Sequence, residues 1–502
     1  MEGSSRKEWL EACSLELQSL KDRNVFTLTE LPPGKRPIEN RWVFARKKSD
    51  NRIKARLVAK GFSQIPGVDY EGIFSPVVRY ETVRIMLALA ALEEWYIQAL
   101  DVKTAFLYGE LDEEIYMKQP EGFKIKGKEH LVLRLNRAIY GLKQASLSWW
   151  KSMTKSMEKM GFKRCQSDAG VFVLRKGNDI VIAVVYVDDA LFMGPNLSLV
   201  MKKKQEFMRT WECRDLGEVK EFLTMRITRK DGRIELDQEQ YLMDVLKRFG
   251  MENAKSAPTP LPMGTQLKPN EGAVDPQLRQ KFQSAIGSLL YLMLGTRPDI
   301  AFAVIQLSKF SANPSQHHLN HALYICKYLV GTSKYRLVLD GKSQKGLCAY
   351  TDSDWAGNKN DYRSITGNLL KIAGGAVSWT TQTQKSVALS STEAEYMAMA
   401  SSARQVMWVK SLYKEIGRND EVILIYADNQ GAIFMSQNPV TNSKSKHIDL
   451  RYHYIRERIL DGAIKPFYVE GSENTADIFT KNLGHEKFSK FRKDLRLVIL
   501  DK

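Results

Sequence analysis

The amino-acid sequence predicts a multidomain protein of the α/β and α+β classes. Its 502 residues are enough for about three domains, because a globular domain usually holds about 100–200 residues. Short apolar runs alternate with helical stretches up to residue 250, and a segment rich in Pro, Gly and polar residues follows at 256–277. Helical spacing comes next, and then a new series of strands and helices. We therefore expect domains at 8–250, 251–340 and 346–484.

The composition favours a nucleic acid as the partner and an intracellular location. Lys and Arg number 75 against 58 Asp and Glu, and the formal net charge of +17 is spread along the chain. Such an excess indicates a polyanionic partner, although many soluble proteins carry one too. The five cysteines form no Cys-x-x-Cys pair, which argues against a structural zinc site. No apolar run approaches the roughly 20 residues of a membrane helix, and the N-terminus does not read as a secretory signal.

The first region opens with an amphipathic helix and contains an acidic cluster. Asp101 ends an apolar strand in WYIQALDVKTAFLYGEL, and IVIAVVYVDDALFMG predicts a β-hairpin with Asp188 and Asp189 at or beside its turn. Asp is common in turns because its side chain bonds nearby backbone groups, so the Asp-Asp pair alone predicts no more than a turn. The apolar flanks favour a metal site instead, because adjacent carboxylates repel each other unless a cation lies between them.

A metal site at these aspartates would have a definite chemistry. Three carboxylates from two neighbouring strands would hold two hard cations about 3.5–4 Å apart, which activate a hydroxyl nucleophile and stabilise a leaving phosphate oxygen. We therefore expect Asp101, Asp188 and Asp189 to bind Mg²⁺, with Mn²⁺ as a substitute. The expected reaction is nucleotidyl transfer.

The two later regions differ in periodicity. IGSLLYLMLGT, DIAFAVIQLSKF and HALYICKYLVGT have helical spacing, whereas LCAYTD, NLLKIAG and AVSWTT predict three successive strands. A long helix follows, with Ser390 or Ser391 as its N-cap and a closing Gly417. EVILIYAD and AIKPFYVEG are then strands, each followed by a helix. Three strands, helix, strand, helix, strand, helix is the order of elements in a ribonuclease H domain.

The last region carries a second acidic cluster. Its four acids occupy strand or helix positions that face one edge of the sheet: Asp352 on the first strand, Glu395 on the long helix, Asp428 at the end of the fourth strand and Asp477 on the last helix. Any one of them would be read as a surface carboxylate. Their common edge argues against that interpretation for all four.

Several blocks of the sequence resemble one family. DVKTAFLYG, IYGLKQAS and YVDD resemble the catalytic signatures of copia-type reverse transcriptases, and the similarity extends to WVFARKKSD, KARLVAKGFSQ, DYEGIFSPVVRYETVR, IGSLLYL and TRPDIAFAV. TDSDWAG, STEAEYMA, YADNQGA and ENTADIFTK resemble the ribonuclease H motifs of the same family. The resemblance, to the Pol polyprotein of copia-type (Pseudoviridae-like) LTR retrotransposons, covers nearly the whole chain. It implies a right-hand polymerase with fingers, palm and thumb, followed by a ribonuclease H-like mixed-sheet domain.

The resemblance implies a role for each acid. In the polymerase, the metal-binding triad would be Asp101, Asp188 and Asp189. In the ribonuclease, the two metal ions that cut the RNA strand of an RNA–DNA hybrid would be held by Asp352, Glu395, Asp428 and Asp477. Glu393 is the alternative to Glu395, which we prefer because its spacing to Ala398 fits the family pattern.

The resemblance also implies substrate contacts. Lys54, Arg56 and Gln144 lie in segments that contact the incoming triphosphate in the family, and Phe106 stands where the family has a steric gate against the 2′-hydroxyl. The alternatives are a solvated strand face for the two basic residues and a core position for Phe106. Ser146 departs from the family, which usually has Pro there, and this departure concerns only loop geometry.

Three further segments of the sequence were considered as possible functional sites. EFLTMRI resembles the element that grips the primer end, although Thr224 stands where the family often has Gly. In HHLNH, His317 and His321 would share a helix face, but the sequence offers no third ligand and we expect no zinc there. His447 is either a nucleic-acid contact or a buried or capping residue.

We therefore expect an RNA-directed DNA polymerase with ribonuclease H activity, which copies element RNA into DNA for integration. The expected partners are an RNA template, a DNA primer, the RNA–DNA hybrid, deoxynucleoside triphosphates and other Pol or Gag products, with no membrane. The expected location is a cytoplasmic virus-like particle or the nucleus, and not the secretory route. The alternative is an inactive or host-adopted nucleic-acid-binding relic, but all seven expected acids are present. No protease, integrase or zinc-knuckle segment is recognisable, so we expect a fragment of a polyprotein or a truncated gene product.

Overall fold

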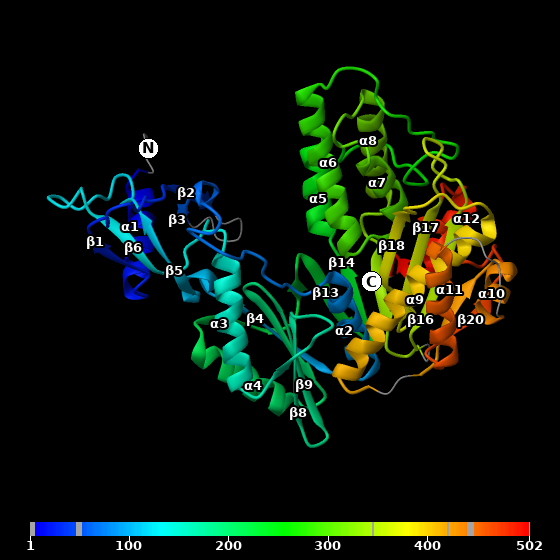
Figure 1. Cartoon of the computed structure of the whole chain (residues 1–502), viewed down its shortest axis with the longest axis horizontal. Coiled ribbons are helices and arrows are strands. Elements are labelled where there is room, and N and C mark those ends of the chain that lie inside the picture. Colours follow the sequence, from blue (N-terminus) through cyan, green and yellow to red (C-terminus); the bar gives the residue numbers. More distant parts are fainter. Residues whose placement is uncertain (1–5, 47–52, 344–345, 419–420, 439–445, 501–502) are drawn as a thin grey trace.

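The computed structural model describes residues 6–46, 53–343, 346–418, 421–438 and 446–500, with the backbone alone at 446–452. The chain builds two small N-terminal sheets, a large antiparallel sheet, a helical region and a mixed sheet, in this order (Figure 1). The expected fold class, a right-hand polymerase followed by a ribonuclease H-like mixed-sheet domain, is confirmed. None of the described helices is both long enough and apolar enough to cross a membrane.

The N-terminal fingers pack one helix against two small antiparallel sheets. The elements are α1 (Arg6–Asp22), the sheet of β1 (Phe26–Thr29), β6 (Val132–Arg137) and β5 (Glu110–Met117), and the pair β2 (Asn40–Arg46) and β3 (Ile53–Ala59). Leu20 of α1, Leu57 of β3 and Leu135 of β6 meet in one buried core. This core fixes β3, which carries Lys54 and Arg56.

The palm is a six-stranded antiparallel sheet whose central strands are buried on both faces. Its strands, in spatial order, are β11 (Cys213–Glu218), β4 (Tyr96–Val102), β10 (Asp189–Gly194), β9 (Asp179–Tyr186), β8 (Val171–Lys176) and β7 (Lys163–Arg164). Ile182 and Val184 of β9 enter one core, and Val181 and Ala183 enter the other. Burial on both faces explains why the central strands β8, β9 and β10 are mostly apolar.

Three helices cover the palm sheet. They are α2 (Tyr80–Leu92), α3 (Ala145–Lys159) and α4 (Leu197–Thr210), and short 3-10 helices lie at η1 (Gly61–Ser63) and η2 (Ala105–Tyr108). Asn196 caps α4 by accepting a hydrogen bond from the Leu199 N–H. α2 also packs against the strands of the C-terminal half of the chain, so it is buried on nearly every side.

The thumb region combines four helices with a five-stranded antiparallel sheet. The sheet contains β12 (Glu221–Phe222), β13 (Met225–Lys230), β14 (Arg233–Asp237), β15 (Arg336–Asp340) and β21 (Leu497–Val498). The helices are α5 (Glu239–Arg248), α6 (Pro276–Gly295), α7 (Ala301–Ser308) and α8 (Gln316–Gly331), with η3 (Pro298–Ile300) before α7. Asp275 caps α6, and Pro276 at the first helical position needs no N–H donor partner. The last strand of the chain thus completes a sheet that begins beside the palm.

The C-terminal domain is a mixed five-stranded sheet with helices. Its strands, in spatial order, are β18 (Gly375–Thr383), β17 (Ile365–Ile372), β16 (Cys348–Asp354), β19 (Ile423–Ala427) and β20 (Ile464–Tyr468). Its helices are α9 (Ser391–Glu415), α10 (Gln430–Gln437), α11 (Lys446–Leu460), η4 (Thr475–Phe479) and α12 (His485–Asp494). The expected three strands, long helix, fourth strand, helix and fifth strand occur in that order, with α11 added before β20 and the 3-10 helix η4 after it, and Ser390 is the N-cap of α9. The helix α11 and the strand β21 were not expected from the sequence.

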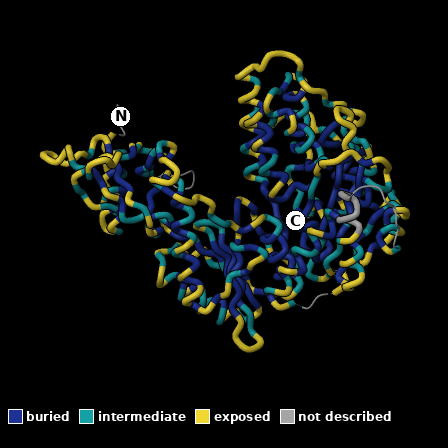
Figure 2. Tube along the Cα trace, viewed as in Figure 1, coloured by how far each residue is buried: buried dark blue, intermediate teal, exposed yellow. Residues whose placement is uncertain are grey.

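One apolar core joins the palm, the thumb and the C-terminal domain, seen as the continuous dark blue centre of Figure 2. Arg84 of α2 is fully buried at this junction, and its guanidinium donates to the carbonyls of Val377, Leu294 and Gly295 at 2.7, 2.5 and 2.8 Å. It also stacks 3.9 Å from the ring centre of Trp379. Burial lowers the pKa of Arg84 to about 10, so the group stays charged at neutral pH. The contact fixes the C-terminal domain on the palm.

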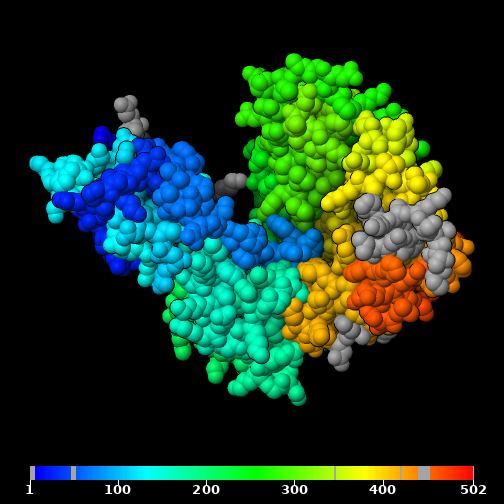
Figure 3. Space-filling model, in the orientation of Figure 1, coloured from blue at the N-terminus to red at the C-terminus, as the bar shows by residue number. Residues whose placement is uncertain are grey.

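A broad hollow separates the fingers from the thumb helices in the space-filling view (Figure 3). The stretch that leads from β3 into α2 crosses the floor of this hollow in Figure 1. The fingers, palm and thumb therefore enclose an open cleft from three sides.

Candidate active sites

The first acidic cluster lies at one edge of the palm sheet. β4 and β10 pair so that Asp101 lies directly opposite Asp189, and the Asp188 carbonyl accepts a hydrogen bond of 2.7 Å from β4. Val187, in the turn between β9 and β10, adopts a left-handed conformation with φ 55°. The indole Nε1 of Trp149 donates to the Val187 carbonyl at 2.7 Å and holds this turn. The register thus brings all three aspartates to the same edge.

The negatively charged carboxylates at this edge repel one another. Burial, together with the negative charges of Asp188 and Asp101, raises the pKa of Asp189 to about 7. A divalent cation would relieve this repulsion by replacing the proton. Within the described residues, however, the oxygens of these three carboxylates do not lie close enough together to hold one metal ion. In this they differ from the second cluster. Binding of a shared cation would therefore move at least one of these side chains.

Phe106 and Arg56, two of the residues expected to contact the substrate, lie near one aromatic ring, that of Tyr140. Phe106, half-buried on η2, meets Tyr140 edge to face at 5.5 Å between ring centres. The guanidinium of Arg56 lies 5.2 Å from the centre of the same ring. Lys54 stands two residues before Arg56 on β3 and so shares its strand face. Phe106 contacts both the palm and the fingers core, which keeps the gate and the core interpretations open.

Gln144 is buried, and the protein engages both ends of its amide. Its Nε2 donates to the Asp69 carbonyl at 2.8 Å and to Glu113 at 3.2 Å, and its Oε1 accepts from Gln64 at 3.0 Å. Ser146, two residues later, accepts at its carbonyl from the Ser75 hydroxyl at 3.1 Å. Gln144 and Ser146 therefore tie the loop at 61–75 to the start of α3.

The segment that resembles the primer grip is the β12–β13 hairpin. Its two turn residues, Leu223 and Thr224, both have positive φ, 51° and 60°. The Thr224 hydroxyl and the hydroxyl of Tyr291 on α6 lie 3.0 Å apart in a hydrogen bond. A pocket of about 700 Å³ beside this hairpin is lined by Lys220 and Arg226, among others. The hairpin is thus tethered to the thumb and borders a cavity whose lining carries charged residues of both signs.

The second acidic cluster converges. Asp352 on β16, Glu395 on α9 and Asp428 just after β19 each offer one carboxylate oxygen, and these oxygens lie within 4.8 Å of one another. Glu395 accepts a hydrogen bond from the Ser353 N–H at 3.1 Å through Oε1, whereas its buried Oε2 has no hydrogen-bond partner in the described part of the chain. Glu393 lies apart from this group and accepts from the Leu389 N–H instead.

The pKa of each of these three acids is raised in the absence of a cation. Burial first, and then the charge of Asp477, raises the pKa of Asp352 to about 8. Burial followed by the charges of Asp352 and Asp428 raises the pKa of Glu395 well above its usual range. The pKa of Asp428 is raised too, mainly by its burial. Buried carboxylates with an unpaired oxygen fit a divalent cation, which prefers such oxygen ligands.

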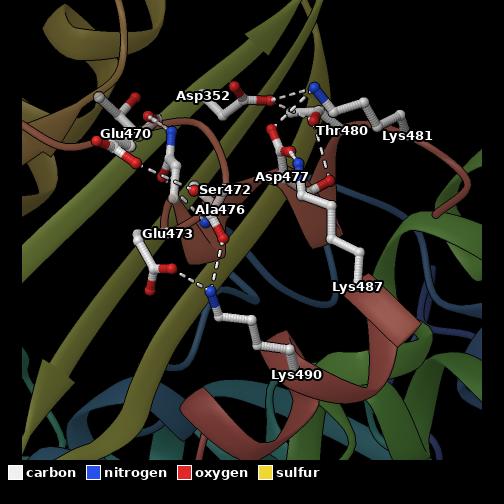
Figure 4. A network of polar contacts seen from close by, with 12 residues as sticks. Asp352, Glu470, Ser472, Glu473, Ala476, Asp477, Thr480, Lys481, Lys487 and Lys490 are labelled. Atoms are coloured by element: carbon white, nitrogen blue, oxygen red, sulfur yellow. Dashed lines mark hydrogen bonds and ion pairs between the residues drawn. The ribbon is translucent and has the colours of Figure 1, made fainter. Parts of the chain in front are cut away.

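Asp477 lies next to this group but binds lysines. The sequence predicted that Asp477 would lie on the last helix, but it stands on the short 3-10 helix η4. Asn474 caps η4 and also donates to the Thr351 carbonyl of β16 at 3.0 Å, which holds this segment against the sheet. Lys481 and Lys487 each form an ion pair with one carboxylate oxygen of Asp477 (Figure 4). Lys481 also approaches Asp352, at 3.9 Å.

These lysines were not expected from the sequence. Lys481 follows Asp477 by four residues in ENTADIFTK, a spacing at which side chains meet across one helical turn, and this spacing was the available signal. Burial alone would lower the pKa of Lys481, but the charges of Asp352 and Asp477 outweigh it and raise this pKa. The side chain of His447 lies outside the described residues.

The comparisons with known proteins agree with this geometry. The family model described as "Reverse transcriptase (RNA-dependent DNA polymerase)" matches residues 23–263. The chain is 40% identical to the retrovirus-related Pol polyprotein from transposon TNT 1-94 of Nicotiana tabacum, over 96% of this chain and 37% of that protein. It is 37% identical to the Pol polyprotein from transposon RE1 of Arabidopsis thaliana, over 97% of this chain and 33% of that protein.

A shorter relative is matched over its full length. The putative transposon Ty5-1 protein YCL074W of Saccharomyces cerevisiae is 32% identical over 61% of this chain and 100% of its own length. The chain spans about a third of the length of the plant Pol polyproteins that it matches. It belongs to the reverse transcriptase family of copia-type retrotransposon Pol polyproteins.

Proposed function

We propose that the chain is an RNA-directed DNA polymerase joined to a ribonuclease H. The observation that carries this proposal is the register of the palm sheet, which sets Asp101 opposite Asp189 beside the turn of Asp188. A second, separate acidic centre on the mixed sheet supports the ribonuclease. Copying RNA yields an RNA–DNA hybrid, whose RNA must be removed before a second DNA strand is made, so the two centres serve one process.

In the polymerase, the three aspartates would hold Mg²⁺, with two ions as the proposed number. Bound Mg²⁺ would activate the primer 3′-hydroxyl and stabilise the leaving pyrophosphate. Lys54 and Arg56 would neutralise the triphosphate from β3, and the ring of Phe106 would clash with a 2′-hydroxyl while offering it no hydrogen bond. Gln144 would act by holding the loop beside the site, since its amide is already bonded within the protein.

In the ribonuclease, Asp352, Glu395 and Asp428 would hold Mg²⁺ and orient an attacking water towards the RNA phosphate. The net charge of +17 supports nucleic-acid partners, which the chain would bind through phosphates and without reading sequence. The RNA template, the DNA primer, their hybrid and deoxynucleoside triphosphates are the proposed ligands. We place the enzyme, with other Pol and Gag products, in a cytoplasmic virus-like particle or the nucleus.

Primer extension on an RNA template with Mg²⁺, run beside cleavage of a labelled RNA–DNA hybrid, tests this function. Asp188→Asn should abolish extension and leave hybrid cleavage, and Asp428→Asn should do the reverse, because the two acid clusters belong to different sheets. If a folded parent protein shows neither activity, the proposal is wrong. Equal loss of both activities in either variant would contradict the separation of the two centres.

A further inference from the structure

We propose that a pocket between the thumb and the mixed-sheet domain holds one backbone phosphate of the RNA–DNA hybrid, beside the ribonuclease centre. The pocket has a volume of about 360 Å³ and is formed by the stretch at 261–271, by α7 and by the loop at 357–360. The proposal rests on the ribonuclease function above. It adds a contact for the same substrate outside the acidic cluster.

Three lysines line the pocket, and each comes from a different segment of the chain: Lys268, Lys309 and Lys359. Within the described residues, none of the three forms an ion pair with a carboxylate. The ammonium group of Lys309 donates to the neutral amide oxygen of Gln306 at 2.7 Å. Positive charges that gather around one cavity without a bound acid favour an anion as its ligand.

The pocket also contains a neutral hydrogen-bond donor and apolar walls. Gln306 lines it, and the buried Nε2 atom of this side chain has no hydrogen-bond partner in the described part of the chain. Phe302 and Phe310 add apolar surface, which excludes water and strengthens the attraction between an ammonium group and an anion. A phosphate oxygen accepts from ammonium and amide donors alike, so the lining matches this group.

Two acids lie near the lysines and do not neutralise them. Glu271 lines the pocket, and Asp361 lies within electrostatic range of Lys309. Asp361, however, also pairs with Arg363, at 3.8 Å. Glu271 therefore faces the three ammonium groups of the lining, which leaves an excess of two positive charges. A backbone phosphate carries one negative charge, so the pocket attracts it.

The pocket lies next to the ribonuclease centre. Asn482 of the lining directly follows Lys481, which approaches the second acidic cluster. Lys359 and Lys481 both lie within electrostatic range of Asp354. Asp354 stands two residues after Asp352 on β16. Successive phosphates of one strand recur about every 3.4 Å along a duplex axis. When one phosphate lies at the second acidic cluster, another therefore comes within reach of the pocket.

The test measures how tightly the full chain binds RNA–DNA hybrids in which one backbone phosphate at a time is replaced by an uncharged methylphosphonate. Ca²⁺ replaces Mg²⁺ to slow cleavage during the measurement. In the parent, one replacement near the cleavage position should weaken binding about tenfold, the size of one charge-assisted hydrogen bond. In the double variant Lys268→Met, Lys309→Met the same replacement should have no further effect, because the lost charge no longer has a partner.

Lys414→Met is the matched control. Lys414 is exposed, forms no ion pair in the part of the chain that the structure describes, and lies at the far end of α9 from Glu395. The effect of the methylphosphonate seen in the parent should persist in this variant. If the double variant does not fold, Lys309→Met alone is compared with the control in the same way.

Additive effects of every methylphosphonate and of the lysine variants would overturn the proposal. A pocket that takes a free anion would overturn it too: inorganic phosphate would then raise the melting temperature of the parent but not of the double variant, and no backbone position would couple to the lysines. Coupling without cleavage in Mg²⁺ would refute the ribonuclease function and leave the pocket standing. Cleavage without coupling would do the reverse.

Discussion

Replacing Arg84 by Met should destabilise the junction between the palm and the C-terminal domain by about 3 kcal/mol or more. The change leaves the buried carbonyls of Val377 and Gly295 and the partly buried carbonyl of Leu294 without their donor. Each unsatisfied buried group costs roughly 1–3 kcal/mol, and loss of the stacking on Trp379 adds up to about 2 kcal/mol. Relief of the desolvation of the buried charge offsets part of this sum, by several kcal/mol.

Urea unfolding followed by tryptophan fluorescence measures the effect, because Trp379 stacks on the guanidinium itself. Arg84→Lys should fall between the parent and Arg84→Met, since an ammonium group cannot supply the same planar fork of donors. Arg79→Met is the matched control: Arg79 is an exposed arginine at the start of the same helix, 5.1 Å from the ring centre of Trp408, and should cost less than about 1 kcal/mol. If the free energy of unfolding of Arg84→Met lies within about 1 kcal/mol of the parent value, as expected for the control, the reasoning is refuted.

Three other perturbations test the two centres. Gly367→Ala places a Cβ 2.8 Å from the Thr480 side chain and 2.9 Å from the Ala476 carbonyl, so it should push η4 outward. Hybrid cleavage should fall while primer extension persists. Equal loss of both activities would contradict this expectation. Phe106→Ala should raise incorporation of ribonucleotides relative to deoxynucleotides, measured by single-nucleotide extension, and an unchanged ratio would make Phe106 a packing residue. The third perturbation is pH in the absence of metal. Because the folded-state pKa of Asp352 is raised to about 8, the metal-free protein should lose stability as pH rises from about 4 to 8. Mg²⁺ should then raise the melting temperature more at pH 8 than at pH 5.5, whereas Asp428→Asn should show a smaller difference.

The positions of most acids could be predicted because each follows a strong local signal. Asp101 ends an apolar strand, Asp188 and Asp189 stand at a hairpin turn, and Glu395 follows a serine cap by five residues. Strand periodicity and capping depend on neighbours in the sequence, so a single chain displays them. The convergence of Asp352, Glu395 and Asp428 then follows from the order of strands in the mixed sheet.

The features that the sequence did not reveal depend on distant partners. Arg84 reads as one polar residue in an apolar helix, and only the arrival of β18 and α6 buries it. The strand β21 is two residues long and has no pattern of its own; its pairing with β15 joins residues that are far apart in the chain. Asp477 seemed to belong to a helix because Ala476 and its neighbours favour one, but contacts with β16 tighten the segment into a 3-10 turn.

The pairing of β21 with β15 has a consequence for any protease that meets this protein. A single cut in the connection between β15 and β16 would separate the polymerase-like part from the mixed-sheet domain in sequence only, because the terminal strand, the buried α2 and the shared core would keep the fragments together. Loss of the last few residues would act differently, since it would remove the outer strand of a sheet that supports the thumb. The nicked protein should therefore migrate as one particle on a sizing column and as two bands only after denaturation.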